Sequence, residues 1–452
     1  MCIENRPARS LPVEERPVAG LRVENAMWGN GAGALVSPPM IARRTRFMSM
    51  VLAGGVGNRL MPLTRDRAKP AVPFAGHYRL IDFALSNLVN GGFRRIVVLT
   101  QYKSDSLNRH LSFTWRMSSL IGDYVTSVPA QMRVGERWFL GSADAIYQNF
   151  NLLHDERPEH VFVFGADHIY RMDPAQMLEL HMESGAGVTV AGIRTPIEEA
   201  GQFGVIEKGE TSHIEAFREK PPDPKPLPDD PGQVLASMGL YVFNTEYLLD
   251  LVEADARNDS SSHDIGGDLI PAAVSAGEAH VYDFADNVVP GSLDRDRGYW
   301  RDVGTIDSYF DAHMDLVHPE PVFNLYNMEW PVYTITRTLA PAKIVAEGGQ
   351  GSRVKDTIFS KGVIISGSKV SDTVLGPAVH IEGNSRVDRS IFMRGVRVGA
   401  GSVIRNAIID KSVIVPPGTE IGVSPERDRE RFQVSAGGVV TIGKQDEITE
   451  PR

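Results

Sequence analysis

The sequence FMSMVLAGGVGNRL at residues 47–60 joins a short apolar run to a glycine-rich loop. The apolar run has the length and composition of a β-strand buried on both faces. Glycines after such a strand let the backbone approach a ligand, and the exposed amides can hold phosphate groups. The loop fails the dinucleotide fingerprint, because Leu60 stands where a third glycine is required, and it lacks the Gly-Lys-Ser/Thr of a Walker A motif. The stretch predicts an α/β domain with a ligand-binding loop after its first strand.

Short apolar runs and amphipathic stretches alternate from this strand to about residue 337. This alternation predicts an α/β domain over residues 47–337, with a doubly wound, mostly parallel sheet covered by helices. A surface loop is predicted for residues 220–232, which hold six prolines. The expected strands are residues 96–100, 161–164 and 188–192, and the expected helices are residues 79–89 and 174–184.

A 17-residue period replaces this pattern after about residue 340. Aliphatic columns predict side chains stacked inside successive coils, and small residues that accept a left-handed backbone predict the corners. Residues 338–452 are therefore expected to form a parallel β-helix. The aliphatic columns are Ile364, Ile381, Val398 and Val415; Val370, Val387, Ile404 and Ile421; and Val374, Ile391 and Ile408. The corner column is Gly367, Asn384, Gly401 and Gly418, followed by Ser368, Ser385, Ser402 and Thr419.

The composition excludes several classes of protein. The chain has 452 residues, 57 acidic and 47 basic, and its net charge of −10 disfavours a basic face for nucleic acid or an anionic membrane. The single cysteine, Cys2, excludes internal disulfides and zinc sites with several thiolates. No apolar run reaches the about 20 residues of a membrane helix. We expect a cytoplasmic protein without nucleic-acid or membrane partners, and a disordered extension at residues 1–46.

Four charged residues are candidates for a phosphate and metal site. Arg59 lies in the glycine loop, and Lys69 lies in a proline-stiffened loop, where each cation suits a phosphate. Asp167 follows a predicted strand at the edge where α/β sheets bind ligands, and Asp302 is a second isolated carboxylate. If the two converge, they suit Mg2+ shared with a triphosphate. The alternatives are a capping role for Asp167 and an ion pair between Asp302 and Arg301.

The proline-rich loop is flanked by candidates for a second, polar ligand. Lys220 is a further phosphate cation, and Glu219 and Ser237 can hydrogen-bond hydroxyl groups. Each of these residues alone is also compatible with an ordinary solvated loop.

In this order the motifs resemble those of the sugar nucleotidyltransferases, and among them the bacterial ADP-glucose pyrophosphorylases. The resemblance covers residues 47–443. It implies a Rossmann-like catalytic domain followed by a left-handed parallel β-helix, usually in a homotetramer. It also implies synthesis of ADP-glucose and pyrophosphate from ATP and glucose 1-phosphate with Mg2+, at the start of glycogen biosynthesis. The matching motifs are residues 53–60, 68–74, 79–87, 100–102, 129–131, 165–168, 262–264 and 299–302.

The resemblance also implies roles for particular residues. Arg59, Lys69 and Asp167 would be catalytic, and Asp167 and Asp302 would hold the metal. Gln101 and Trp138 lie in loops that the family links to activator response. The residues implied to contact the nucleotide are Leu52, Ala53, Gly54, Gly55, Gly57, Gln131 and Gly141. Those implied to contact the sugar phosphate are Lys220, Glu219, Ser237, Tyr102 and Gly204.

Three positions depart from the family pattern. Ala75 replaces a usual glycine, and Phe139 stands where many relatives have tyrosine. Asp66 replaces an effector-binding lysine of enterobacterial relatives, and its charge would repel a phosphorylated activator such as fructose 1,6-bisphosphate. The cations that remain for another sugar-phosphate effector are Arg67, Arg79 and Arg431.

Three other functions compete with this interpretation. A nucleotidyltransferase of the same fold could use UTP, GTP or dTTP, because base choice rests on a few loop contacts. An acyltransferase is disfavoured, because beyond Pro331 the only histidine is His380 and these enzymes commonly use a histidine base. A non-catalytic regulatory subunit is disfavoured because all the candidate metal and phosphate ligands are present.

Overall fold

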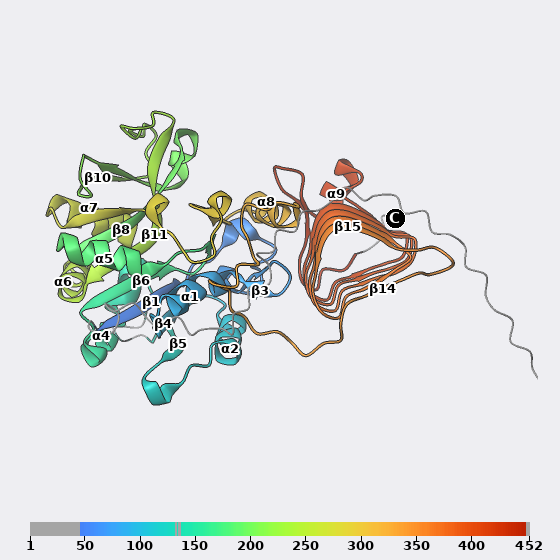
Figure 1. Cartoon of the computed structure of the whole chain (residues 1–452), viewed down its shortest axis with the longest axis horizontal. Helices are drawn as coiled ribbons and strands as arrows, with labels where there is room; N and C mark the ends of the chain where they lie inside the picture. Colours follow the sequence, from blue (N-terminus) through green and yellow to red (C-terminus); the bar gives the residue numbers. More distant parts are fainter. Residues whose placement is uncertain (1–45, 132, 134–136, 449–452) are drawn as a thin grey trace, which may run out of the picture. The chain divides into compact units, whose positions relative to one another are not determined.

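The computed structural model describes residues 46–131, 133 and 137–448, and Figure 1 shows their secondary structure. All of them belong to one compact unit, Pro38–Arg452. Of the extension predicted at residues 1–46, only Arg46 is described, and Cys2 lies outside the described residues. None of the helices in the described part is long and apolar enough to cross a membrane.

A nine-stranded sheet organises the first part of the chain. Strands β6, β1, β4 and β5 are adjacent and parallel, as the alternating pattern predicted. Strand β11 runs antiparallel to β6, β8 and β9, so the expected strand at residues 188–192 belongs to a mixed part of the sheet. The strands are β1 (Phe47–Ala53), β4 (Arg95–Thr100), β5 (Tyr124–Pro129), β6 (His160–Gly165), β8 (Val188–Pro196), β9 (Gly204–Lys208), β10 (Ile214–Glu219), β11 (Gln233–Asn244) and β12 (Ala279–Asp283).

Two apolar cores cover the two faces of this sheet. Alternate residues of a strand point to opposite faces, so Val51 lies in one core and Met50 in the other. Helices cover both faces, and the predicted helix at residues 174–184 is confirmed as α5. The helices are α1 (Leu80–Asn90), α2 (Asp105–Thr114), α3 (Ser142–Tyr147), α4 (Phe150–Glu156), α5 (Pro174–Ser184), α6 (Thr245–Ala256), α7 (Ile270–Ser275) and α8 (Ile306–Val317).

Two small antiparallel pairs lie outside the large sheet. Strand β7 (His168–Tyr170) pairs with β13 (Trp300–Asp302), which brings together two segments that are far apart in sequence. Strand β2 (Pro73–Phe74) pairs with β3 (Tyr78–Arg79) just before α1. Both pairs hold residues that the sequence singled out as candidates for the site.

Parallel strands stacked in coils form the second part of the chain, with the triangular outline seen in Figure 1. One sheet contains β14 (Lys343–Val345), β16 (Ile364–Ser366), β18 (His380–Ile381), β20 (Arg397–Val398) and β22 (Ile414–Val415). The other contains β15 (Arg353–Phe359), β17 (Lys369–Leu375), β19 (Arg386–Phe392), β21 (Val403–Ile409), β23 (Glu420–Ile421), β24 (Gln433–Val434) and β25 (Val440–Ile442). The short helix α9 (Pro425–Arg431) follows the last full coil.

The corners of the coils have left-handed backbone conformations. The predicted corner column is confirmed, with positive φ at Gly367, Asn384, Gly401 and Gly418. Two further columns of positive φ were not predicted, because their residues are chemically mixed. These are Gly362, Ala378, Gly395 and Ser412, and Asp356, Asp372, Arg389 and Asn406. Each coil therefore turns three corners, and a single corner carries the small-residue signal.

The first predicted aliphatic column is wrong by one residue at its start. Strands β16 and β18 pair Ile365 with Ile381, and Ile364 with His380. Ile365 is fully buried, whereas Ile364 is half-buried. The spacing is 16 residues here and 17 in the next two coils, so a uniform period misplaces the first row. The column that begins at Val370 keeps the predicted register.

An apolar cluster joins α8 to the stacked strands. Tyr309 and Phe310 of α8 belong to the same buried cluster as Val374, Ile391 and Ile408 of the coils. The third predicted aliphatic column therefore packs in this cluster with α8 as well as with its neighbouring coils. Because apolar side chains of both α8 and the coils are buried in this cluster, it stabilises the packing of the coils against α8.

Candidate active site

The ammonium group of Lys69 brings the two predicted metal ligands together. Its Nζ lies 2.9 Å from Oδ2 of Asp167 and 2.9 Å from Oδ1 of Asp302. The lysine side chain is 9% exposed. The question that the sequence left open is therefore answered, because both carboxylates meet at one cation position.

Backbone pairing holds these three residues in place. Asp167 follows β6, and the β7–β13 pair matches His168 with Asp302, so the two aspartates leave neighbouring strand ends. Lys69 opens a short 3-10 turn, η4 (Lys69–Ala71), beside them. The amide of Ala68 donates to the carbonyl of Lys103 at 3.2 Å, which anchors the start of that turn.

Each charge stabilises the others. Burial opposes the charged form of Asp167, but the neighbouring Lys69 and His168 outweigh it and lower the pKa of Asp167 to about 2. Burial likewise opposes the charged form of Lys69, but the two carboxylates outweigh it and raise the pKa of the lysine. At neutral pH a charged Lys69 therefore lies beside a charged Asp167.

Two neighbouring carboxylates fit a divalent metal that is shared with a substrate. Within residues 46–131, 133 and 137–448, no three His, Cys, Asp or Glu side chains gather into a metal-binding group. A site with two protein carboxylates suits Mg2+, which usually completes its octahedron with water and phosphate oxygens.

The glycine loop packs directly against Lys69. Gly57 has a φ of 69°, and a Cβ there would lie 3.0 Å from Cβ of Lys69 and 3.1 Å from Cγ2 of Thr64. The hydroxyl of Thr64 donates to the carbonyl of Gly57 at 2.8 Å. Beyond the loop, Nη2 of Arg59 lies 3.8 Å from Oδ2 of Asp302, and its side chain is 68% exposed. The loop thus places an available cation next to the aspartate pair.

Other candidates follow the same edge of the sheet. Gly54 follows β1, Gln101 follows β4, Gln131 follows β5 and Asp167 follows β6. These four strands are parallel and adjacent, so their carboxyl ends share one edge. A Cβ on Gly54 would lie 3.7 Å from Cβ of Gln101, which shows how closely neighbouring loops approach.

A cavity of about 290 Å³ lies beside the aspartate pair. It is lined by Leu52 of the first strand and by Asp302 of the metal candidate, and on the other side by residues of β9, β10 and β11. Five sequence candidates are among its lining residues, namely Leu52, Gly204, Glu219, Ser237 and Asp302. The structure therefore brings the candidates for the polar ligand next to one of the two aspartates.

Glu219 and Gly204 face each other across a strand pair. A Cβ on Gly204 would lie 2.4 Å from Cζ of Phe217 and 2.9 Å from Oε2 of Glu219, so only glycine fits there. Lys220 has a φ of 45° and its ammonium group pairs with the carboxylate of Glu219. Its amide donates to the carbonyl of Phe203, a cavity residue, at 2.9 Å. Lys220 thus stands at the rim of the cavity.

Tyr102, Gln131 and Gly141 are among the candidates that do not line this cavity. Tyr102 lies after β4, where the ammonium group of Lys103 sits 4.7 Å from the centre of its ring. Gln131 is exposed and accepts a hydrogen bond from Arg133 at 3.3 Å. Gly141 packs against another loop, because a Cβ there would lie 2.1 Å from the carbonyl oxygen of His263.

The sequence did not single out several cavity residues. His168 lies next to Asp167, and its ring centre is 4.8 Å from that of Trp300. Burial outweighs the nearby carboxylates and lowers the pKa of His168, which favours the neutral ring. Asp264 also lines the cavity and accepts a hydrogen bond from Oγ of Ser142 at 2.8 Å. Both residues lie inside quoted motifs, but without a strand pairing nothing in the sequence points them at a cavity.

Comparison with known proteins assigns both parts of the chain. A nucleotidyl transferase family model matches residues 48–318, and a GlmU-like C-terminal hexapeptide model matches residues 340–442. A glucose-1-phosphate adenylyltransferase of Corynebacterium jeikeium is 55% identical over 402 residues, which cover 89% of this chain and 98% of the relative. The chain belongs to the glucose-1-phosphate adenylyltransferase family. The hexapeptide match and the parallel coils agree with the left-handed β-helix that the resemblance implied.

Other relatives of the same name are equally similar. The glucose-1-phosphate adenylyltransferase of a Parafrankia species is 57% identical over 406 residues, covering 89% of this chain and 98% of the relative. That of Mycolicibacterium paratuberculosis is 58% identical over 397 residues, covering 88% and 97%. Family membership therefore extends over both parts of the chain.

Within this member of the family, Arg67 has a partner of its own. Its Nη2 lies 3.0 and 2.7 Å from the two carboxylate oxygens of Asp410 in β-helix residues that follow β21. The two side chains are 4% and 0% exposed. A guanidinium committed to a buried carboxylate offers little to an incoming anion, so the structure points to a different role for Arg67.

Two further basic residues, Arg79 and Lys411, lie near enough to this ion pair for the charge of Arg67 to affect their pKa values. Burial lowers the pKa of Arg79 to about 10, and the nearby charges of Arg67 and Arg394 act in the same direction. Burial and the charges of Arg67 and Arg79 lower the pKa of Lys411 to about 6. Arg431, the third effector candidate, lies in α9 and lines a different, solvent-open hollow with Arg65.

The departures from the family pattern occupy ordered positions. Ala75 has a φ of 47°, in the region that favours glycine, and its amide donates to Nε2 of His313 at 3.1 Å. The amide of Phe139 donates to Oε1 of Gln101 at 2.6 Å, so backbone atoms at residue 139 hold Gln101. The side chain of Trp138 beside it is exposed.

Proposed function

We propose that this chain is an ADP-glucose pyrophosphorylase, which makes ADP-glucose and pyrophosphate from ATP and α-glucose 1-phosphate. The observation that carries the proposal is the meeting of Asp167 and Asp302 at Lys69, beside a cavity with Glu219 and Ser237. Charged groups suited to phosphate and metal thus lie beside groups that can hydrogen-bond a sugar. The names of the relatives support ATP and glucose as the specific substrates.

The proposed reaction is a direct displacement at the α-phosphorus of ATP. A phosphate oxygen of glucose 1-phosphate forms the new P–O bond, and the bond to the β-phosphate oxygen breaks, releasing pyrophosphate. Transfers of this kind need positioning and charge neutralisation more than covalent catalysis. Lys69 and Arg59 would neutralise the triphosphate, with the backbone amides of the glycine loop beside it.

The sugar would occupy the cavity. Glu219 and Ser237 would accept and donate hydrogen bonds to glucose hydroxyls, and Lys220 at the rim would pair with the sugar phosphate. Gly204 keeps the wall opposite Glu219 free of a side chain. The roles of Tyr102, Gln131 and Gly141 rest on the family resemblance alone.

Mg2+ is the proposed metal, held by Asp167 and Asp302. When bound, it would neutralise charge that develops on the leaving pyrophosphate. The ammonium group of Lys69 lies 2.9 Å from both carboxylates, so the two aspartates already face a common cation, which supports the assignment. We also propose that the product feeds an α-glucan such as glycogen, and that the chain assembles as a homotetramer like other members of the family.

An anionic effector is proposed for the cation group around the Arg67–Asp410 pair. Burial and neighbouring cations lower the pKa of both Arg79 and Lys411, so each loses its positive charge more easily than usual. A sugar phosphate would favour their charged forms. Arg67 would then anchor the site through Asp410 and would not contact the effector itself.

Isotopic labelling tests the proposed reaction. With ATP labelled at the α-phosphate and glucose 1-phosphate, the label should appear in ADP-glucose. With ATP labelled at the γ-phosphate, it should appear in pyrophosphate. Label from the γ-position in a sugar phosphate would indicate a kinase-type transfer and would contradict the proposal.

A further inference from the structure

The turn that forms one wall of the cavity has a strained backbone at a residue that never touches the cavity. His263 has a φ of 57°, in the left-handed region that a β-carbon disfavours. It directly precedes Asp264, Ile265 and Gly266, which all line the cavity. A conformation of this kind persists only where the surroundings hold it.

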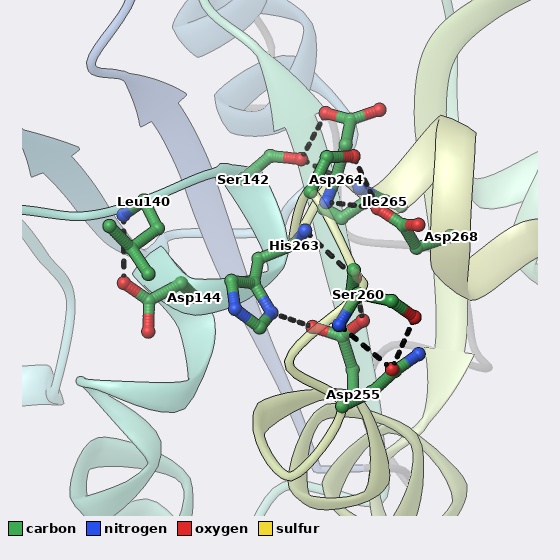
Figure 2. A network of polar contacts seen from close by, with 12 residues as sticks. Leu140, Ser142, Asp144, Asp255, Ser260, His263, Asp264, Ile265 and Asp268 are labelled. Carbon is green, nitrogen blue, oxygen red and sulfur yellow. Dashed lines mark hydrogen bonds and ion pairs between the residues drawn. The ribbon is translucent and has the colours of Figure 1, made fainter.

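A buried pair with Asp255 holds this residue. Nδ1 of His263 lies 2.7 Å from Oδ2 of Asp255 near the end of α6, and the two side chains are 12% and 7% exposed. Ser261 closes the arrangement, since its hydroxyl donates to Oδ1 of Asp255 at 2.6 Å and accepts from the amide of His263 at 2.9 Å. Figure 2 shows the imidazole of His263 directed at Asp255.

The strained turn directs the carbonyl of His263 and the carboxylate of Asp264 toward the start of α3. The carbonyl of His263 accepts from the amide of Ala143 at 2.8 Å, in the first turn of α3. Gly141 makes this approach possible, because any side chain there would collide with that carbonyl. One residue later, Oδ1 of Asp264 accepts from Oγ of Ser142 at 2.8 Å. The turn and the start of α3 are therefore locked together.

Further hydrogen bonds keep the wall rigid around Asp264. Oδ2 of Asp264 accepts from the amide of Gly267 at 2.9 Å, and the amide of Asp264 donates to Oδ2 of Asp268 at 2.9 Å. The amide of Ile265 donates to Oγ of Ser142 at 2.7 Å. Figure 2 shows Ser142, Asp264, Ile265 and Asp268 next to the His263–Asp255 pair.

We infer that His263 and Asp255 are positioning residues for the sugar-phosphate substrate. They hold the left-handed turn that fixes Ser142 and Asp264 in the cavity wall. Neither His263 nor Asp255 lines the cavity itself. The inference rests on the proposed function, because it assigns glucose 1-phosphate to this cavity. Loss of the His263–Asp255 pair should make the cavity wall less rigid and weaken the binding of the sugar phosphate. The nucleotide contacts around the glycine loop should stay intact.

The test is isothermal titration calorimetry with glucose 1-phosphate, combined with separate KM values for the two substrates, on the full chain. We expect Asp255→Ala to weaken glucose 1-phosphate at least fivefold and to change the KM for ATP less than twofold. Asp250→Ala is the matched control, since Asp250 is an exposed aspartate of the same helix. It should behave like the wild type.

Two substitutions at residue 263 separate the turn from the ring. Asparagine tolerates the left-handed conformation and alanine does not. We therefore expect His263→Asn to keep more affinity for glucose 1-phosphate than His263→Ala, although both lose the imidazole. A role in general stability would lower the thermal midpoint and leave the ratio of the two KM values unchanged. If Asp255→Ala fails to fold, Asp255→Asn, which keeps an acceptor, should show a smaller loss in the same direction.

The possible failures are distinguishable. A wild type that binds no glucose 1-phosphate would overturn the proposed function and this inference together. A wild type that binds it, with folded Asp255 variants of unchanged affinity, would overturn the inference alone. Equal losses in His263→Asn and His263→Ala would also overturn it, because the backbone conformation would then not matter.

Discussion

Lys69 and Asp302 are 233 residues apart in sequence, yet Nζ of the lysine lies 2.9 Å from Oδ1 of the aspartate. The same ammonium group contacts Asp167, which arrives from a third segment of the chain. Three distant segments thus build one charged cluster at the edge of the sheet. The proposed metal and the triphosphate would bind where these segments meet.

Removing either carboxylate should impair turnover more than substrate binding. We expect Asp302→Asn and Asp167→Asn each to lower kcat by at least about 100-fold, because each removes a ligand from the metal that stabilises the leaving group. The KM for glucose 1-phosphate should change only a few fold. Steady-state kinetics at several Mg2+ concentrations checks this, with Asp294→Asn, whose side chain is 99% exposed, as control. Wild-type turnover in either variant would refute the metal assignment.

The glycine loop allows two kinds of defect to be separated. Gly57→Ala places a Cβ at a φ of 69° and 3.0 Å from Cβ of Lys69, so it should lower both the unfolding temperature and the activity. The backbone strain alone is worth about 1 kcal/mol. A Cβ on Gly55 meets nothing within 4 Å, so Gly55→Ala should unfold like the wild type and raise only the KM for ATP. A lowered unfolding temperature in Gly55→Ala would contradict this account of the loop.

The Arg67–Asp410 pair should act as a buried structural link. Asp410→Asn leaves the guanidinium of Arg67 without its carboxylate and should lower the free energy of unfolding by about 3–5 kcal/mol. The double variant Arg67→Met with Asp410→Leu should lose much less, because it leaves no unpaired buried charge. Urea unfolding of Arg67→Met, Asp410→Leu and the double variant measures the coupling. Additive losses would show that the two side chains act independently.

Lys411 should make stability depend on pH. Burial and neighbouring cations lower its pKa to about 6, against 10.5 as its ordinary value. Between these pH values Lys411 binds a proton in the unfolded chain but not in the folded chain. The contribution of Lys411 to the free energy of unfolding therefore rises with pH. Lys411→Met removes that contribution and should be the more stable variant near pH 6. Thermal midpoints should show the advantage shrinking toward pH 9, and a constant difference would contradict the assignment.

Local sequence patterns predicted the strands and helices. The arrangement of the site depends on contacts between distant segments, which such patterns do not reveal. The strand before the glycine loop, helix α5 and two of the three aliphatic columns follow from short-range periodicity, which the backbone conformation dictates directly. The first column failed by one residue, because the spacing from β16 to β18 is 16 residues and the later spacings are 17. Two corner columns escaped notice because aspartate, arginine and serine occupy positive φ there, held by the neighbouring coils.

The candidate site shows the same division. Asp167 and Lys69 could be proposed because each lies beside a recognisable strand or proline-stiffened loop. Arg67 looked equally available, and only the fold reveals that Asp410, 343 residues away, neutralises it. His168 and Asp264 carry no local sign that they face a cavity, since that depends on the pairing of β7 with β13 and on the turn at His263.

Release of pyrophosphate tests the central claim most directly. The measurement is the initial rate with each of ATP, UTP, GTP and dTTP, combined with glucose 1-phosphate or mannose 1-phosphate, at fixed Mg2+. We expect the highest kcat/KM for ATP with glucose 1-phosphate, and little turnover with the other pairs. A preference for UTP, GTP, dTTP or mannose 1-phosphate would contradict it.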